Sequence, residues 1–134
     1  MSKLAFIFPG QGAQKAGMGK DFYENSEAAR SFFDQAQKIL DFDLKEMCFG
    51  EHEELNLTEY TQPCMVSVCL AIVQELKKRG INPDITAGLS LGEYAAVAAA
   101  DGMNELDAIK LVRRRGILMQ STVPAGEGAM AAVL

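Results

Sequence analysis

The sequence has few of the residues on which metal and disulfide chemistry depend. Its 134 residues include no tryptophan, one histidine and three cysteines, Cys48, Cys64 and Cys69. An odd number of cysteines without C-x-x-C spacing argues against a disulfide framework, and one histidine leaves a zinc ligand set hard to assemble. We therefore expect buried thiols, no metal site and a reduced, cytoplasmic setting.

Long runs of apolar or basic residues are also missing. The longest apolar stretches, such as residues 95–100, fall far short of the ~20 residues that a membrane-spanning helix needs. The run Leu4–Phe8 is too short for the core of a signal peptide. The net charge is −5 and no basic run is longer than the three residues Arg113–Arg115, which argues against binding to nucleic acid. We expect a globular protein with neither a membrane nor a nucleic acid as its partner.

The order of apolar runs and helical patterns predicts an α/β fold. Short continuous apolar runs at residues 4–8 and 85–87 predict buried strands. Helical spacing of apolar residues predicts helices over residues 26–40, 61–79, 91–100 and 104–120, with a single turn at 44–49. Strands separated by helices imply parallel pairing, with helices covering the sheet.

Some details of the helices follow from single residues. Asn25 or Ser26, and Asn104, are the expected N-caps of two helices. Pro63 is expected in the first turn of its helix, where the missing N–H costs nothing. Leu118 or Met119 is expected to face inward. The apolar tail at residues 129–134 is predicted to begin a further strand.

The stretch at residues 88–92, Gly-Leu-Ser-Leu-Gly, matches the G-x-S-x-G pattern of a nucleophilic serine. In that pattern the serine occupies a strained turn between a strand and a helix, and the flanking glycines let neighbouring backbone approach closely. The turn exposes the Ser90 hydroxyl and places the backbone N–H of Leu91 where an oxyanion can form. The alternative interpretation is a glycine-flanked turn that only packs a helix against a strand.

A serine nucleophile needs a base, and the sequence offers no good candidate. His52 lies in an acidic segment and is expected to be a solvated surface histidine. Glu93 and Asp101 are expected to be a first-turn acid and a helix-end residue.

A second glycine-rich loop spans residues 10–19, after the first predicted strand. Gly10 and Gly12 give G-x-G, but Lys15 stands in place of the third glycine and no G-K-[ST] occurs. The dinucleotide and P-loop fingerprints are therefore incomplete. What remains is a donor-rich loop at a strand end, where α/β proteins bind ligands.

Two motifs together, FPGQGAQ at residues 8–14 and GLSLGEYAA at 88–96, resemble the malonyl-CoA:acyl-carrier-protein transacylase family. This family also occurs as the acyltransferase domains of fatty-acid and polyketide synthases. The similarity continues through TEYTQP at 58–63, RRRGILMQ at 113–120 and VPAGEGAMAAVL at 123–134. It implies an α/β-hydrolase-like core, of which residues 1–127 are the N-terminal part. Residues 128–134 would begin the first strand of a ferredoxin-like subdomain.

The resemblance also implies roles for five residues. Ser90 accepts the acyl group as an ester, and the backbone N–H groups of Gln11 and Leu91 form the oxyanion hole. Arg115 pairs with the free carboxylate of a malonyl group, and Gln62 lines the same pocket. An arginine can hold a carboxylate bidentately, which would separate malonyl from acetyl substrates.

Without the resemblance, a cationic last turn of a helix is the simpler interpretation of Arg113–Arg115. With it, the implied reaction is ping-pong transfer of a malonyl group from malonyl-CoA to the phosphopantetheine thiol of acyl carrier protein, in fatty-acid synthesis. Malonyl-CoA is a substrate, and no cofactor is bound. The N-terminal Met-Ser-Lys favours a free-standing enzyme.

Two features depart from the family. Leu89 stands where the family usually has a histidine just before the nucleophile. The family's catalytic histidine lies beyond residue 134, so we expect an N-terminal portion of a transacylase that is inactive alone. The open alternatives are a serine thioesterase or hydrolase with the same turn, and a truncated binding piece without catalysis.

Overall fold

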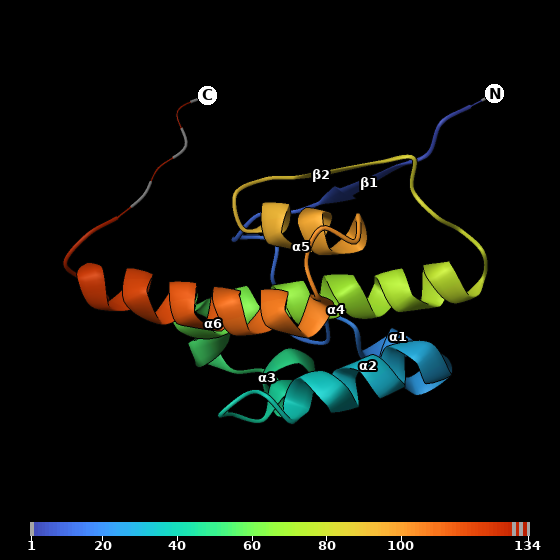
Figure 1. The fold of residues 1–134 in the computed structure, drawn as a ribbon. Helices are drawn as coiled ribbons and strands as arrows, with labels where there is room; N and C mark the ends of the chain where they lie inside the picture. The colour runs from blue at the N-terminus through green and yellow to red at the C-terminus, as the bar shows by residue number, and fades with distance from the viewer. Residues whose placement is uncertain (1, 130, 132, 134) are drawn as a thin grey trace.

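A small parallel sheet packs against layers of helices in this chain (Figure 1). The computed structural model describes residues 2–129, 131 and 133. Strands β1 (Ala5–Phe8) and β2 (Ile85–Gly88) pair in parallel, with Ala5 opposite Ile85 and Phe8 opposite Gly88. The helical elements are α1 (Lys20–Asn25), α2 (Glu27–Gln37), α3 (Leu44–Phe49), the 3-10 turn η1 (Glu53–Asn56), α4 (Thr58–Lys78), α5 (Gly92–Ala99) and α6 (Glu105–Thr122). The predicted α/β class with a parallel sheet is confirmed, but the strands are not buried on both faces as predicted, because Ile7 and Ile85 are 78% and 62% exposed.

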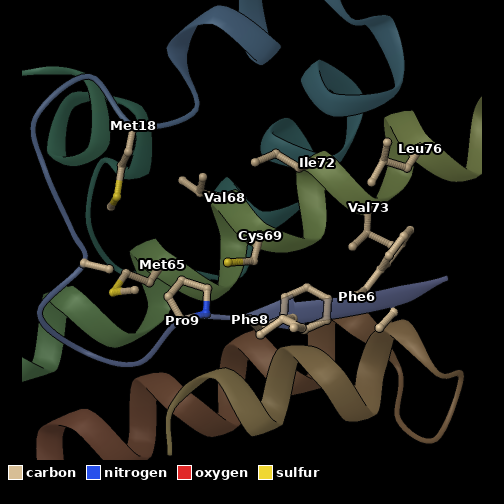
Figure 2. Close-up of a pocket in the computed structure, with 13 residues that line it drawn as sticks. Phe6, Phe8, Pro9, Met18, Met65, Val68, Cys69, Ile72, Val73 and Leu76 are labelled. Carbon is tan, nitrogen blue, oxygen red and sulfur yellow. The ribbon is translucent and has the colours of Figure 1, made fainter. Parts of the chain in front are cut away.

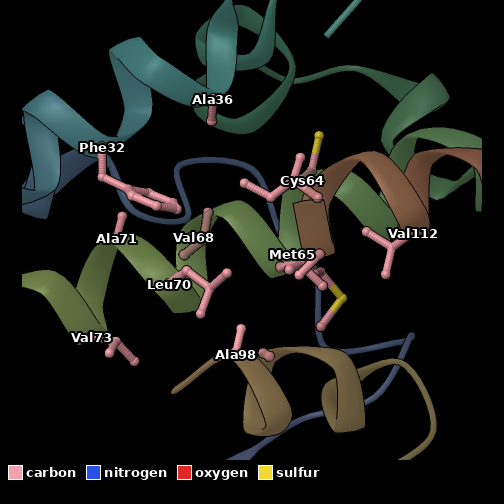
Figure 3. Close-up of a cluster of buried hydrophobic side chains, with 14 of the residues drawn as sticks. Phe32, Ala36, Cys64, Met65, Val68, Leu70, Ala71, Val73, Ala98 and Val112 are labelled. Carbon is pink, nitrogen blue, oxygen red and sulfur yellow. The ribbon is translucent and has the colours of Figure 1, made fainter. Parts of the chain in front are cut away.

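Helix α4 is the centre of the core. Figure 1 places it between the sheet and α5 on one side and α1 to α3 on the other, with α6 alongside. Its buried side chains point in several directions: Leu70 faces Ala98 of α5, whereas Ala71 faces Phe32 of α2 (Figure 3). Full burial of a leucine or phenylalanine side chain stabilises the folded state by ~1.5–3 kcal/mol. Because α4 buries such side chains on several sides, it holds the surrounding elements in their relative positions.

The predicted helix caps are present. The Ser26 hydroxyl accepts a hydrogen bond from the N–H of Ala29 at 3.0 Å, and Asn104 accepts from the N–H of Leu106 at 3.0 Å. Helix α2 ends at Gln37, before the predicted end at residue 40. The short helix α1 was not predicted, since it has no buried residue and hence no apolar pattern to detect.

Pro63 lies in the second turn of its helix and not in the first, because α4 begins at Thr58. A proline there has no N–H to donate to the carbonyl of Glu59, four residues earlier. Arg113 Nη1 donates to that oxygen instead, at 2.7 Å. The arginine therefore satisfies the acceptor that Pro63 leaves free, and it joins α6 to α4 at that point.

The inward face of α6 is a stripe of small and apolar residues. Ala108, Val112 and Gly116 form a buried stripe with four-residue spacing. Met119 lies three residues after Gly116 on the same helix face, and its sulfur accepts a hydrogen bond from the buried Gln62 of α4 at 3.3 Å. Of the two residues predicted as alternatives, Met119 therefore faces α4 while 41% exposed, whereas Leu118 is 49% exposed. The strand predicted at the C-terminal tail includes residues 130, 132 and 134, which lie outside the described residues, and it stays a prediction.

Candidate active site

Ser90 occupies the turn between β2 and α5. Its φ is +49°, in the left-handed region that residues other than glycine rarely adopt. The turn is closed by the N–H of Gly92, which donates to Leu89 O at 2.9 Å, and by the N–H of Glu93, which donates to Ser90 O at 3.1 Å. Ser90 is exposed. This strand, strained turn and helix are the structural context that the G-x-S-x-G pattern requires.

The two flanking glycines are required by close backbone contacts. A Cβ at Gly88 would lie 2.1 Å from the carbonyl carbon of Gly92, and a Cβ at Gly92 would lie 2.3 Å from Phe8 O. Both distances are far below contact, so neither position has space for a side chain. The glycines therefore allow α5 to pack tightly against the strands, and they also shape the turn that exposes Ser90. The packing turn and the nucleophile turn, which the sequence offered as alternatives, are both present in this one segment.

The loop after β1 lies beside the Ser90 turn. Since β1 and β2 are parallel, their carboxyl ends meet at one edge, where the N–H of Leu89 donates to Phe8 O at 3.1 Å. A Cβ at Gly10 would lie 2.9 Å from Leu89 O. Among the described residues, the backbone N–H groups of Gln11 and Leu91 donate to no acceptor. The loop after β1 and the turn after β2 thus each bring one backbone N–H group without an acceptor to the surroundings of Ser90.

Arg115 reaches the serine from α6. Its Nη2 donates to Ser90 Oγ at 3.4 Å and its Nη1 to Gln62 Oε1 at 2.8 Å. The guanidinium lies over the Tyr94 ring, 5.4 Å from the centroid. Gln62 is fully buried and donates through Nε2 to the sulfur of Met119 at 3.3 Å. Within the described part of the chain, Arg115 pairs with no carboxylate, so a positive group is oriented beside the hydroxyl and open to an anion.

Arg113, two residues earlier, has a different environment. Its guanidinium lies over the rings of Phe42 and Tyr60, 5.1 and 5.0 Å from their centroids, and the two rings pack edge to face 5.2 Å apart. It donates to both carboxylate oxygens of Asp41, at 2.9 and 3.0 Å. Burial opposes the charge, yet the hydrogen bonds to Asp41 and the neighbouring acids raise the pKa of Arg113. The same hydrogen bonds lower the pKa of Asp41.

These contacts separate the roles of the arginines. Arg113 is a structural link, whereas Arg115 faces the serine. Helix α6 continues to Thr122 and has no basic residue in its last turn. The interpretation of Arg113–Arg115 as a cationic helix end was therefore wrong.

His52 is held by an acid far from the serine turn in the sequence. Its Nε2 lies 3.0 Å from Glu46 Oε1, and among the described residues no hydrogen bond joins it to Ser90. Glu93 lies in the first turn of α5, as predicted. Asp101 follows the end of α5 and accepts from Lys77 Nζ at 3.0 Å. None of these three side chains is bonded to the Ser90 hydroxyl.

Two residues that contact the site were not predicted from the sequence. Tyr94 stacks on Arg115 from the first turn of α5, and no sequence pattern indicated this contact. Thr58 accepts a hydrogen bond from Gln11 Nε2 at 2.9 Å, and no sequence pattern indicated it. Leu89, next to the serine, is 71% exposed, so the side chain that departs from the family resemblance is open to solvent.

An apolar hollow lies elsewhere, between β1 and α4 (Figure 2). It measures about 420 Å³ and is lined by side chains such as Phe6, Phe8, Val68 and Ile72. Its cysteine, Cys69, has a pKa raised to about 11 by burial, so it is a thiol at neutral pH. The hollow therefore offers apolar packing and no reactive group.

The described residues form neither a metal-binding cluster nor a membrane-spanning helix. They contain no group of three or more histidine, cysteine, aspartate or glutamate side chains arranged to hold a metal ion. None of the helices that they form combines the length and the apolar character that crossing a membrane demands.

The fold and the site define an α/β protein with a serine on a strained turn between a strand and a helix. Residues 5–134 match the family model described as the acyl transferase domain. The chain therefore belongs to the acyl transferase domain family.

Relatives and solved structures agree with this assignment. The "Malonyl CoA-acyl carrier protein transacylase" of Bacillus subtilis (strain 168) is 50% identical over 135 residues, which cover 100% of this chain and 43% of the relative. The transacylase structure from Clostridium perfringens superimposes with a TM-score of 0.87 at 44% identity, over 93% of this chain and 40% of that one. The solved structure described as a type II polyketide acyl carrier protein in complex with its malonyl-transacylase contains a chain that superimposes with a TM-score of 0.87 at 39% identity. The match covers 93% of this chain and 41% of that one. This chain thus spans less than half the length of the relatives it matches.

Proposed function

We propose that this chain supplies the nucleophile, the oxyanion hole and the carboxylate-binding arginine of a malonyl-CoA:acyl-carrier-protein transacylase. The carrying observation is the 3.4 Å separation between Arg115 Nη2 and Ser90 Oγ. In a malonyl thioester, one methylene separates the carboxylate from the reacting carbonyl. A cation beside the nucleophile can therefore bind the carboxylate while the serine attacks the carbonyl.

The reaction has two acyl transfers through one seryl ester. Ser90 Oγ loses its proton to a base and attacks the thioester carbonyl of malonyl-CoA, after which the C–S bond breaks and coenzyme A leaves as its thiol. The phosphopantetheine thiol of acyl carrier protein then attacks the ester and releases Ser90. In both steps the N–H groups of Gln11 and Leu91 donate to the oxyanion.

The base is proposed to come from the part of the transacylase fold outside these residues, since the single histidine, His52, is bonded to Glu46. Residues 1–127 then form the N-terminal part of the core, and residues 128–134 begin the ferredoxin-like subdomain. We expect the chain alone to give no measurable malonyl transfer. Turnover by residues 1–134 that disappears with Ser90→Ala would contradict this expectation.

Acyl carrier protein is proposed as the acceptor, in fatty-acid synthesis in the cytoplasm. The names of the relatives and the solved complex of a malonyl-transacylase with its carrier protein support this choice. A thioesterase is disfavoured, because hydrolysis of a neutral acyl chain has no use for the cation that Arg115 places beside the serine.

The test uses residues 1–134 fused to the C-terminal portion of the Bacillus subtilis relative, beyond the matched region; we call this fusion the completed transacylase. It is incubated with malonyl-CoA, with and without acyl carrier protein bearing phosphopantetheine. We expect malonyl-carrier protein as the product, and none from the Ser90→Ala variant. Rapid release of free malonate that does not depend on carrier protein would instead indicate a hydrolase.

A further inference from the structure

The loop that carries Gln11 is anchored by side chains. Gln11 Nε2 donates to Thr58 Oγ1 at 2.9 Å, and Gln14 Nε2 donates to Asn56 Oδ1 at 3.1 Å. Gln14 Oε1 in turn accepts from the backbone N–H of Gly12 at 2.7 Å. Among the described residues, the backbone N–H groups of residues 11–14 donate to no backbone carbonyl. Residues 11–14 are therefore held through the two glutamine side chains and the segment at residues 56–58, whereas the end of the loop is held by the N–H of Gly17, which donates to Cys48 O at 2.9 Å.

Thr58 also contacts the helix that carries Arg115. Thr58 is the first residue of α4, and the N-cap Leu57 has no side-chain acceptor for the free N–H groups of the first turn. Gln120 of α6 takes that role, since its Oε1 accepts from the N–H of Thr58 at 3.0 Å. Gly116 allows this approach, because a Cβ there would lie 2.8 Å from Thr58 O. Thr58 thus contacts the loop through its hydroxyl and α6 through its backbone.

We propose that Thr58 is a positioning residue for acyl transfer, whose hydroxyl holds the Gln11 side chain and thereby aims the Gln11 backbone N–H at the oxyanion. The proposal rests on the proposed function, since it requires Gln11 as an oxyanion donor. Thr58 acts only through Gln11. Carboxylate binding is separate from the Thr58 hydroxyl, because Gln62 and Tyr94 hold Arg115.

The expected size of the effect follows from the kind of change. Removal of one oxyanion donor lowers turnover by about 10²- to 10³-fold. Loss of the Thr58 hydroxyl leaves the Gln11 N–H in place but less well aimed, so a smaller loss of about tenfold is expected. Because the oxyanion forms with every acyl group, the loss should be equal for malonyl and acetyl substrates.

The experiment compares four variants of the completed transacylase. Thr58→Val keeps the shape and removes the hydroxyl, whereas Thr58→Ser keeps the hydroxyl. Gln11→Ala keeps the backbone N–H and removes the side chain that Thr58 holds, and the fourth variant combines Thr58→Val with Gln11→Ala. Rapid-quench measurements give the rate of Ser90 acylation by malonyl-CoA and by acetyl-CoA, and thermal unfolding midpoints check the fold of each variant.

We expect Thr58→Val and Gln11→Ala each to slow acylation about tenfold with both substrates, and the double variant to be no slower than either. Thr58→Ser should recover most of the rate. Equal rates for Thr58→Val and Thr58→Ser, or losses that multiply in the double variant, would overturn the proposal while leaving the proposed function intact. A loss confined to malonyl-CoA would also overturn it, since it would place the effect at Arg115.

Gln11→Ala tests the proposal separately if Thr58→Val lowers the unfolding midpoint, because Gln11 is an exposed loop residue. A Gln11→Ala variant that acylates at the full rate would then refute the role of the side-chain contact. Failure of the unsubstituted completed transacylase to form malonyl-carrier protein would contradict the proposed function itself, and with it this inference.

Discussion

Replacement of Arg115 should convert a malonyl-selective enzyme into one that does not discriminate. We expect Arg115→Gln to lower kcat/KM for malonyl-CoA while leaving acylation by acetyl-CoA within a few fold of the unsubstituted enzyme. The reason is that only the malonyl group carries a carboxylate for the guanidinium to bind. Tyr94 and Gln62 hold the guanidinium beside Ser90, so the binding geometry exists before the substrate arrives.

The size of this effect can be worked out from the contacts of Arg115. Nη1 is occupied by Gln62 Oε1, which leaves Nη2 and Nε for the carboxylate. Hydrogen bonds to charged groups are worth about 1.5–3 kcal/mol, and a loss of about 3 kcal/mol corresponds to roughly 100-fold in kcat/KM. Arg115→Lys keeps the charge but loses the planar fork, so an intermediate loss of about tenfold is expected.

The assay measures initial rates of acyl transfer by the completed transacylase with each acyl-CoA. Arg114→Gln is the matched control, because this neighbouring arginine is exposed and lies outside the site. Arg115→Gln also leaves the buried Oε1 of Gln62 without its donor, so the unfolding midpoint of each variant is measured alongside. Equal losses with malonyl-CoA and acetyl-CoA would refute the assignment of Arg115 to the carboxylate.

Three further predictions concern the packing around the site. Gly92→Ala should destabilise the completed transacylase by ~1–3 kcal/mol in urea unfolding and slow Ser90 acylation, because the new Cβ would lie 2.3 Å from backbone; unchanged stability would contradict the close approach. Arg113→Lys should also lower the free energy of unfolding. The part of this loss that is due to the Asp41 contact should be present above pH 4 and should disappear as the pH falls through the lowered pKa of Asp41, below 3.8. A variant with the same acid unfolding profile as the parent would contradict this prediction. Cys69 should react slowly with iodoacetamide at pH 8 and faster only as the pH approaches its pKa of about 11; rapid labelling at pH 8, followed by mass spectrometry, would contradict burial of the thiol.

The sequence predicted the elements whose signals are local. Apolar runs, glycines and capping residues determine the strands, the Ser90 turn and the starts of α2 and α6, and each of these depends on residues within a few positions. The turn was especially predictable because it needs both glycines: a Cβ at Gly88 or Gly92 would lie 2.1 or 2.3 Å from backbone atoms. Family resemblance then added the roles proposed for Gln11, Gln62 and Arg115.

What the sequence could not predict arises from contacts between distant segments. The start of α4 was misplaced because Pro63 indicates a first turn, whereas Arg113, 50 positions later, satisfies the carbonyl that the proline leaves free. The close crossing of α6 with α4 was not predicted, because it depends on the small size of Gly116. The different roles of Arg113 and Arg115 could be assigned only from their contacts, with Asp41 and with Ser90 respectively.

The central claim is that Ser90 carries the malonyl group while Arg115 holds its carboxylate. Its most direct test is peptide mass spectrometry of the completed transacylase, quenched after brief exposure to malonyl-CoA without carrier protein. The account predicts a malonyl ester on the peptide that contains Ser90, strongly reduced in Arg115→Gln and absent in Ser90→Ala. A malonyl group on another residue, or full labelling of Ser90 in the Arg115→Gln variant, would contradict it.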